Sequence, residues 1–362
     1  MRIIYLIPGT YRPAGMERVL AEKANWLVKH GHEILIVTCE QKGREPAFEF
    51  DSRIRTVDLD IGHEDNNGRS FLNKLIHFPI KHYKHRKALE ELLMREKADI
   101  VVSMFGNEAS FLPTIKDSSR KVLEIHFSRF KRLQYGRKGL WALADRWRNR
   151  HDAVTAKRYD RFVVLTEEDK EYWGPLGNIQ VIPNPRTFTF DAPAPLDNHQ
   201  VLAVGRYNHQ KGFDMLLDAW EIINPQGWTL RIAGGGDDLG PVPDNVILGP
   251  STDIKEEYLN SAFLVLSSRY EGLPMVLLEA QAAGLPAVAF TCKCGPRDVI
   301  TDGENGILVP EGDVDGLAAG MRRLMNDSKL RRLMGAAAYR NSDKYDKERI
   351  MSLWENLFQE LS

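Results

Sequence analysis

The sequence predicts an α/β protein with two doubly wound domains in series. Its 362 residues exceed what one ordinary hydrophobic core accommodates. Short apolar segments alternate with amphipathic stretches almost throughout, which is typical of parallel sheets covered by helices on both faces. A proline-rich segment without periodicity, at 184–198, interrupts this alternation and therefore indicates a boundary between two such domains.

The first half is expected to form a parallel sheet whose strands are short, buried apolar runs. The expected strands lie at 2–7, 33–38, 54–58, 99–104, 121–125, 161–165 and 179–182. Helical periodicity occupies the stretches between most of them. The expected helices lie at 15–30, 70–97, 108–116, 139–158 and 167–173.

The second half repeats the alternation. Its expected strands lie at 200–204, 229–233, 245–248, 262–266, 286–290 and 306–309. Its expected helices lie at 211–223, 252–260, 274–283, 313–326, 328–341 and 345–361. We predict an N-terminal domain at 1–184, a linker at 185–198 and a C-terminal domain at 199–341. Because ligands of such sheets bind at the carboxyl ends of strands, we expect the site in a cleft between two facing sheets.

The composition favours a cytoplasmic globular protein. Hydrophobic residues make up 43% of the chain, and no apolar run approaches the roughly 18–20 residues that span a bilayer. The N-terminal apolar stretch is too short for a signal peptide. Cys39, Cys292 and Cys294 are too few, and odd in number, for a disulfide framework. Cys292 and Cys294 could form half a metal site, but no second Cys or His pair lies nearby in sequence.

Two cations follow the strand expected at 200–204. Gly205 provides a turn, and Arg206 and Lys211 precede the next helix. Arginine can fork onto phosphate oxygens and lysine adds a point charge, so this loop suits a pyrophosphate. Two solvated loop cations are the alternative interpretation.

A glycine–proline turn follows the strand expected at 262–266. Gly272 allows a close backbone approach, and Pro274 fits the first turn of the following helix. The N–H groups of Gly272 and Leu273 would help to form an anion site at that helix N-terminus. Glu271 precedes the turn, where its carboxylate could reach a sugar.

Glu279 lies more than one turn into this helix, where a carboxylate can accept both hydroxyls of a ribose. An exposed helical glutamate is the alternative. The helix is apolar nearly all round, as in a buried helix, and a charge there usually has a partner or a ligand. The glycines at 234–236 lack the spacing of a dinucleotide fingerprint. They form either a loop that approaches a nucleotide or a simple turn.

The N-terminal half offers two candidate residues. Gly15 ends a flexible loop after the first strand, and the helix that follows could face an anionic ligand with its N–H groups. His126 ends the strand at 121–125 and could donate a hydrogen bond to a sugar hydroxyl or to developing phosphate charge. An ordinary strand–helix loop and a structural histidine are the respective alternatives.

These motifs resemble those of retaining glycosyltransferases with two Rossmann-like domains facing across a cleft, the GT-B fold, and specifically those of family four. Glu271 and Glu279 match the glutamate–seven residues–glutamate element of that family. Residues 205–212 match its G-R-x(4)-K-G element. The similarity covers essentially the whole chain. Ala14-Gly15 departs from the usual Gly-Gly pair, and Asn184-Pro185 from the usual Asn-Gly.

The resemblance implies roles for these residues. Arg206 and Lys211 would hold the donor diphosphate, Glu279 the ribose and Glu271 the sugar hydroxyls. Backbone donors would come from Gly272 and Leu273. His126 would contact the sugar, and a C-terminal helix within 342–362 would cross back to the N-terminal domain.

The function implied is metal-independent transfer, with retention, of a hexose or N-acetylhexosamine from a nucleotide-sugar. The acceptor would be a glycan or a lipid-linked sugar in cell-surface polysaccharide or lipopolysaccharide synthesis. UDP is the expected nucleotide, with GDP-mannose open, and no cofactor is expected besides this donor. A nucleotide-sugar epimerase of the same fold and a non-catalytic nucleotide-sugar-binding protein are the alternatives.

Charge is unevenly distributed along the chain. Residues 1–184 hold 32 Lys and Arg against 25 Asp and Glu, whereas residues 185–362 hold 17 against 25. The stretch 120–161 carries 13 basic and 4 acidic residues, interleaved with Phe127, Phe130, Leu133, Tyr135, Leu140, Trp141 and Trp147. With the segment 76–87, it favours peripheral binding to an anionic membrane, on the inner face of the cytoplasmic membrane. Nucleic acid is disfavoured because the chain lacks its binding motifs and is not basic overall. A solvated helix face is the alternative.

Overall fold

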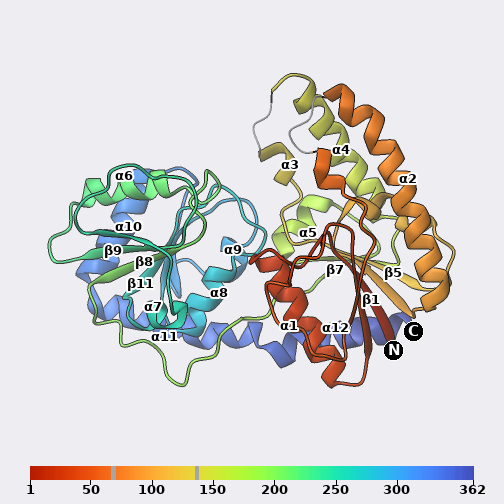
Figure 1. The fold of residues 1–362 in the computed structure, drawn as a ribbon. Helices are drawn as coiled ribbons and strands as arrows, with labels where there is room; N and C mark the ends of the chain where they lie inside the picture. The colour runs from red at the N-terminus through yellow and green to blue at the C-terminus, as the bar shows by residue number, and fades with distance from the viewer. Residues whose placement is uncertain (67–70, 135–137) are drawn as a thin grey trace. The chain divides into compact units, whose positions relative to one another are not determined.

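The chain folds into two compact units, described here from a computed structural model of residues 1–66, 71–134 and 138–362 (Figure 1). Unit 1 consists of Met1–Val164, Lys170–Ile182 and Met351–Ser362. Unit 2 consists of Leu165–Asp169 and Pro183–Ile350. Each unit contains its own sheet and its own hydrophobic core, so each is described separately below.

Unit 1 is built on a seven-stranded sheet with the order β3-β2-β1-β4-β5-β6-β7. All neighbouring strands run parallel. The strands are β1 (Arg2–Leu6), β2 (Glu33–Thr38), β3 (Arg55–Asp58), β4 (Ile100–Ser103), β5 (Arg120–Glu124), β6 (Arg161–Val164) and β7 (Ile179–Val181). Consecutive parallel strands need crossover connections, and the intervening helices supply most of them.

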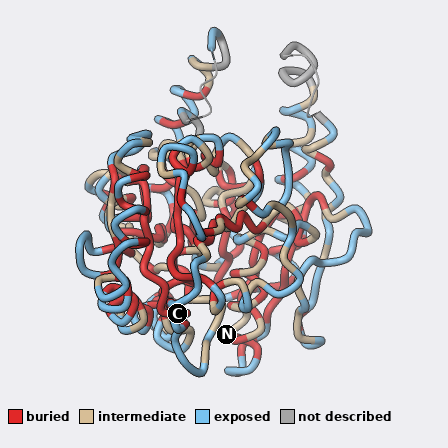
Figure 2. Tube along the Cα trace, turned by 90° about the vertical axis from the view of Figure 1, so that its left-hand side faces the viewer, coloured by how far each residue is buried: buried red, intermediate tan, exposed pale blue. Residues whose placement is uncertain are grey.

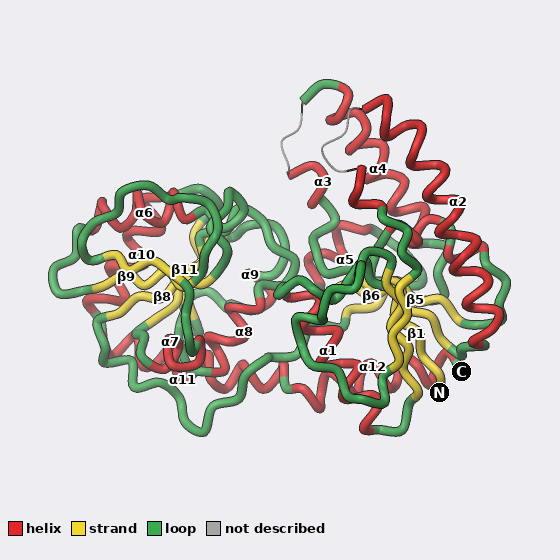
Figure 3. Tube along the Cα trace, in the orientation of Figure 1, coloured by secondary structure: helices red, strands yellow, loops and turns green. Residues whose placement is uncertain are grey.

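The helices of unit 1 include one long helix and several short ones. The helices are α1 (Gly15–Lys29), η1 (His63–Asn66), α2 (Phe71–Glu96), η2 (Asn107–Ser110), η3 (Leu112–Thr114), α3 (Lys131–Gln134) and α4 (Leu140–Ala156). Two further helices, α5 (Glu167–Trp173) and α12 (Lys347–Leu361), contribute residues to both units. Figure 3 shows the strands and helices along the chain.

The core of unit 1 forms because the strands are apolar on both faces. Ile3, Ile4 and Tyr5 of β1 are all fully buried, as are Val101 and Val102 of β4. In Figure 2, runs of buried residues alternate along the chain with exposed and intermediate ones. Burial on both faces is what a parallel sheet under two helical layers requires.

Unit 2 contains a six-stranded sheet with the order β10-β9-β8-β11-β12-β13, again parallel throughout. The strands are β8 (Gln200–Val204), β9 (Thr229–Ala233), β10 (Val246–Gly249), β11 (Phe263–Leu266), β12 (Ala287–Phe290) and β13 (Gly306–Val309). Its remaining helices are α6 (Phe213–Ile223), α7 (Ile254–Leu259), α8 (Met275–Ala282), α9 (Pro296–Val299), α10 (Val314–Asn326), α11 (Ser328–Asn341) and η4 (Ser342–Tyr345).

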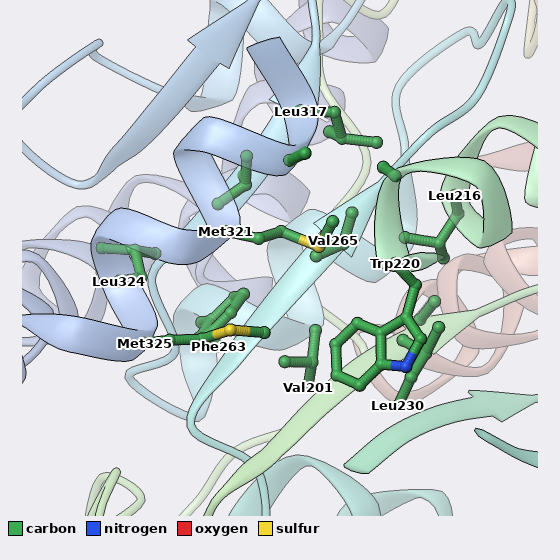
Figure 4. Close-up of a cluster of buried hydrophobic side chains, with 14 of the residues drawn as sticks. Val201, Leu216, Trp220, Leu230, Phe263, Val265, Leu317, Met321, Leu324 and Met325 are labelled. Atoms are coloured by element: carbon green, nitrogen blue, oxygen red, sulfur yellow. The ribbon is translucent and has the colours of Figure 1, made fainter. Parts of the chain in front are cut away.

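One core cluster of unit 2 lies between the sheet and the helices α6 and α10 (Figure 4). Trp220 of α6 is 1% exposed, and its indole N–H donates to Asn245 Oδ1 at 3.1 Å. Met321 and Leu324 of α10 are fully buried on the same strands. Burying one large apolar side chain contributes about 1.5–3 kcal/mol, so this cluster fixes both helices on the sheet.

The structure confirms the predicted α/β fold with two parallel sheets and corrects one helix. The helix expected at 108–116 is instead two 3₁₀ segments, η2 and η3. Pro113 lies in the middle of that stretch, where it cannot donate an N–H to a helical hydrogen bond. Within the described residues, no helix has the length and apolar character needed to cross a membrane.

The segment 185–198 contains no helix or strand and is part of unit 2. Arg186 donates to Ser342 Oγ at 2.7 Å and to Asp346 Oδ2 at 3.1 Å. Farther along, the N–H of Ala194 donates to the carbonyl of Ala283 at 2.8 Å. These contacts fix an irregular segment to the surface of the unit to which it belongs.

Candidate active site

The candidate residues of unit 2 lie on loops at one edge of its sheet, except Glu279, which lies on helix α8 after one of these loops. The strands β9, β8, β11 and β12 are neighbours in the sheet and run in the same direction. Their carboxyl ends therefore share an edge, and the loops that follow them come together there. This edge is where open α/β sheets bind ligands.

The loop at 205–212 depends on two glycines. Gly205 has a φ of 155°, and a Cβ there would lie 2.9 Å from Lys211 Cε, so the missing side chain leaves room for the lysine stem. Gly212 has a φ of 64°, and a Cβ there would lie 2.1 Å from the carbonyl oxygen of Ser267. Glycine is therefore required at both ends of the loop.

Lys211 and Glu271 form an ion pair that joins the two sequence motifs. Their Nζ and Oε1 atoms are 2.8 Å apart, and the two residues are 60 positions apart in the chain. The side chains are only 17% and 9% exposed. The charges of this pair are therefore screened by solvent less than those of a surface ion pair. For Lys211, the structure thus excludes the alternative of a solvated loop cation.

Arg206 and Arg269, the two arginines of these loops, differ in their contacts. It is exposed, and within the described part of the chain it makes no hydrogen bond or ion pair. Arg269, in contrast, donates to both carboxylate oxygens of Asp214 and to the carbonyl of His209 at 2.8 Å. Arg269 therefore fixes the loop, while the guanidinium of Arg206 remains accessible to an anion.

The turn before α8 is packed closely against a neighbouring loop. A Cβ on Gly295, whose φ is 95°, would lie 2.4 Å from Pro274 Cδ and 3.0 Å from the carbonyl oxygen of Gly272. Leu273 is buried, and Pro274 is the N-cap residue of α8 with no side-chain cap. The expectation that Pro274 lies within the first turn is therefore wrong by one residue, since the helix begins at Met275.

Glu279 is buried in α8 and has a tyrosine partner. It is 5% exposed, and the hydroxyl of Tyr258 donates to its Oε2 at 2.7 Å. Tyr258 lies on α7 and is itself fully buried. The structure thus excludes an exposed helical glutamate. Sequence reasoning missed Tyr258, because one tyrosine in an amphipathic helix gives no sign that it contacts a carboxylate.

The glycines at 234–236 serve to pack two loops together. A Cβ on Gly234 would lie 1.9 Å from the carbonyl oxygen of Gly205, and one on Gly236 would lie 2.4 Å from that of Tyr207. The N–H of Tyr207 donates to the carbonyl of Gly235 at 2.8 Å. These contacts give Gly234 and Gly236 a packing role against the loop at 205–212, which neither interpretation of the stretch anticipated.

The cysteines near this edge are buried free thiols. Cys292 is fully buried, and burial together with the charge of Glu271 raises the pKa of its thiol. Cys294 Sγ lies 3.2 Å from Asp169 Oδ1 as a hydrogen-bond donor, and burial raises its pKa as well. A buried thiol with a raised pKa is a poor nucleophile and a poor metal ligand.

The two N-terminal candidates lie in unit 1. Gly15 is the first residue of α1, preceded by Ala14 as an N-cap without a side-chain hydrogen bond. His126 follows β5, and its Nε2 lies 3.0 Å from Glu124 Oε1. The His126 side chain is only 6% exposed. Histidine at this position is therefore held against a buried carboxylate, which the sequence did not indicate.

The arrangement in unit 2 suits a ligand with both anionic and hydroxyl groups. Arg206 and Lys211 supply positive charge, and the N-terminus of α8 supplies backbone N–H groups. Glu271 and Glu279 supply carboxylate acceptors for hydroxyls. A nucleoside diphosphate linked to a sugar has this combination of groups.

Two protein-family models match the chain, one in each half. The model described as "Glycosyltransferase Family 4" matches residues 13–186. The model described as "Glycosyl transferases group 1" matches residues 198–327 and so includes all the unit 2 candidates.

Similar proteins include an amylovoran biosynthesis glycosyltransferase, AmsD, from Erwinia amylovora. It is 36% identical over 218 residues, which cover 55% of this chain and 62% of that protein, so the match spans less than two-thirds of the relative. A GalNAc-α-(1→4)-GalNAc-α-(1→3)-diNAcBac-PP-undecaprenol α-1,4-N-acetyl-D-galactosaminyltransferase from Campylobacter jejuni is 25% identical, with coverage of 100% and 99%. Sucrose-phosphate synthase from Thermosynechococcus elongatus has a TM-score of 0.82 at 19% identity, with coverage of 99% and 98%. The structural similarity confirms the GT-B fold.

Proposed function

We propose that this chain, a glycosyltransferase with the GT-B fold, moves a hexose or N-acetylhexosamine from a nucleotide-sugar to a glycan or lipid-linked acceptor, with retention of anomeric configuration. The observation that carries the proposal is the shielded Lys211–Glu271 pair, 2.8 Å long, which joins a cationic loop to a carboxylate loop at the sheet edge. We place the reaction in the synthesis of cell-surface polysaccharide or lipopolysaccharide.

The donor is proposed to be a UDP-sugar held by unit 2. Arg206 and Lys211 bind the diphosphate, with backbone donors from Gly272 and Leu273 at the start of α8. Lys211 has three N–H donors, so it can bind a phosphate oxygen while it keeps its contact with Glu271.

The remaining donor contacts are to hydroxyls. Glu271 accepts hydrogen bonds from the transferred sugar, and Glu279 from the ribose. Tyr258 holds Glu279 Oε2 in place for this purpose. Gly205 lies in the loop that carries Arg206 and Lys211, and Pro274 lies in the turn before α8. Their proposed role is to let the backbone and the two cations come close to the donor.

The proposed chemistry needs no protein nucleophile and no metal ion. The bond between the anomeric carbon and the diphosphate oxygen breaks, and the acceptor oxygen bonds to the same face of that carbon. The acceptor hydroxyl gives its proton to the departing phosphate oxygen. Arg206, Lys211 and the α8 N–H groups stabilise the charge that develops on the diphosphate. This stabilisation makes the largest contribution to the proposed rate enhancement.

In unit 1, we propose that His126 contacts the transferred sugar and that Gly15 contributes the N-terminus of α1 to donor binding. The His126 ring is held 3.0 Å from Glu124 Oε1. Its imidazole would donate a hydrogen bond to a sugar hydroxyl or to the developing phosphate charge.

We further propose that unit 1 docks on an anionic membrane, at the inner face of the cytoplasmic membrane, where lipid-linked acceptors are available. Phe78 and Tyr83 of α2 are 45% and 68% exposed, and Trp147 of α4 is 65% exposed. Basic residues lie among them, including exposed Lys84 and Arg146. Tyr135, and the side chains of Leu140 and Trp141, lie outside the described residues. Exposed aromatics interleaved with basic residues favour an anionic lipid surface.

The donor assignment is tested by thermal shift with a panel of UDP- and GDP-sugars. We expect one UDP-sugar to raise the melting temperature and Arg206→Ala to abolish that rise. The melting temperature of the free protein should not change, because Arg206 is exposed and makes no hydrogen bond or ion pair within the described residues. Stabilisation that is unchanged in Arg206→Ala would contradict the assignment. Epimerisation of the UDP-sugar without an acceptor would support the epimerase alternative instead.

A further inference from the structure

Unit 1 contains a fully buried ion pair between α1 and β5. Lys23 Nζ lies 2.6 Å from both carboxylate oxygens of Glu124, and the two residues are 101 positions apart. Their side chains are 2% and 1% exposed. This bidentate contact joins a helix to the centre of the sheet.

Aromatic residues enclose the pair. Lys23 Nζ lies 3.8 Å from the ring centroid of Trp354, on α12, and 5.2 Å from that of Tyr5, on β1. Trp354 and Tyr5 are themselves buried, at 3% and 0% exposure. The pair is thus isolated from solvent by the core of unit 1.

Stability alone does not account for such a pair. The desolvation free energy of two buried charges is often as large as, or larger than, the energy of their attraction. A protein in which apolar side chains of similar volume replace such a pair is often equally stable or more stable. A buried pair therefore points to a role in which the charges themselves are needed. A third ionisable side chain contacts the pair.

The third group is His126, because Glu124 lies between it and Lys23. Glu124 Oε1 is 3.0 Å from His126 Nε2 and 2.6 Å from Lys23 Nζ. Burial alone would raise the pKa of Glu124, but the charges of Lys23 and His126 outweigh it and hold the pKa at about 2. Neither ring nitrogen of His126 makes a well-aligned hydrogen bond within the described residues, so the contact with Glu124 is chiefly electrostatic.

We propose that Lys23 and Glu124 are positioning residues for His126: Lys23 fixes the Glu124 carboxylate, which holds the imidazole at its Nε2 edge. The ring then presents its Nδ1 side to the ligand in a fixed orientation. This inference rests on the proposed role of His126 in sugar transfer. It adds two residues that touch neither donor nor acceptor and that act through the histidine.

The test compares Glu124→Gln with a neutral double variant, Lys23→Met with Glu124→Leu. The double variant removes both charges together, so it should fold with a melting temperature near that of the wild type. We expect kcat for sugar transfer to fall on the order of 10- to 100-fold in both variants, since displacing a catalytic group by about 1 Å can cost about 100-fold. The affinity for the UDP-sugar should stay within about twofold, because the residues proposed to bind the diphosphate and ribose lie in unit 2.

A second buried ion pair of unit 1 provides the matched control. Lys121 and Asp117 are 6% and 0% exposed, and they pair at the start of β5 rather than beside His126. The neutral variant Lys121→Met with Asp117→Asn should leave kcat unchanged. If the Lys23/Glu124 double variant also keeps the wild-type kcat, the pair is only structural and the proposal is overturned.

A readout that does not need activity separates this proposal from the proposed function. In protein with ¹⁵N-labelled histidine, the His126 signals are assigned by their loss in His126→Asn. We expect Glu124→Gln to shift the Nε2 and Nδ1 resonances of His126, and the control variant to leave them in place. Unchanged resonances would overturn the positioning role. Shifted resonances in a protein that transfers no sugar would instead place the failure in the proposed function.

Discussion

At the scale of single residues, the candidate site depends on pairs that bring distant positions together. Lys211 meets Glu271 across 60 positions, and Tyr258 meets Glu279 across 21. In each pair, a partner from another loop or helix holds a carboxylate proposed to bind hydroxyls. Substituting the partner therefore tests the carboxylate's role without removing the carboxylate.

Tyr258→Phe should weaken donor binding while leaving the fold intact. Glu279 loses the hydroxyl that holds its Oε2, and a hydrogen bond to a charged group contributes about 1.5–3 kcal/mol. We expect the Kd for the UDP-sugar, measured by calorimetry, to rise about tenfold. Tyr345→Phe is the control, because that buried tyrosine of unit 2 donates to a backbone carbonyl, that of Asp298, at 3.1 Å. An equal loss of affinity in both variants would contradict the role of Tyr258.

Glu108→Gln should change how stability depends on pH. Glu108 is buried, accepts hydrogen bonds from Ser103 Oγ at 2.6 Å and from the N–H of Gly106 at 3.1 Å, and burial raises its pKa. The folded protein then binds more protons than the unfolded chain above the ordinary carboxyl pKa, so wild-type stability falls as pH rises through that window. Each pKa unit of the shift corresponds to about 1.4 kcal/mol.

Glutamine keeps the acceptor oxygen but does not titrate. The free energy of unfolding of Glu108→Gln, relative to that of the wild type, should therefore be larger at pH 8 than at pH 5, so the variant is relatively more stable at the higher pH. Urea unfolding at the two pH values measures this difference. The same relative stability at both values would show that Glu108 titrates normally.

At the scale of elements, local sequence patterns predicted most helices and strands. The strands at 200–204 and 229–233 and the helices at 167–173 and 328–341 lie where they were expected. Local periodicity specifies such elements because each has an apolar face that must be buried. The patterns failed at 108–116 and did not reveal α9, because four residues are too few to show a helical period.

The exposed aromatic residues Tyr83 of α2 and Trp147 of α4 allow a test of membrane docking. Tyr83→Ser combined with Trp147→Ser should reduce flotation with vesicles that contain anionic phosphatidylglycerol, because it removes two exposed aromatic side chains. Leu333→Ser is the control, since Leu333 is 61% exposed on α11 of unit 2. Wild-type protein that fails to float at low salt would refute membrane docking, as would equal flotation of both variants.

At the scale of the whole molecule, the sequence predicted the fold class, and two of the motifs that it singled out lie together in unit 2. The order of apolar and amphipathic stretches indicated two parallel sheets, and the motifs at 205–212 and 271–279 do meet at the edge of one of them. The pairs Lys23–Glu124 and Tyr258–Glu279 could not be predicted. The two residues of each pair lie on different elements, and the tertiary fold decides how those elements pack. Local sequence patterns therefore do not indicate these contacts.

The central claim is that Glu271, paired with Lys211, contacts the sugar during transfer from a nucleotide-sugar. The most direct test is the initial rate of transfer at saturating donor, measured for the wild type and for Glu271→Ala with the acceptor that supports turnover. We predict a loss on the order of 100-fold in rate for Glu271→Ala, because the transferred sugar and Lys211 both lose the carboxylate that positions them. Transfer by Glu271→Ala at the wild-type rate would contradict the account.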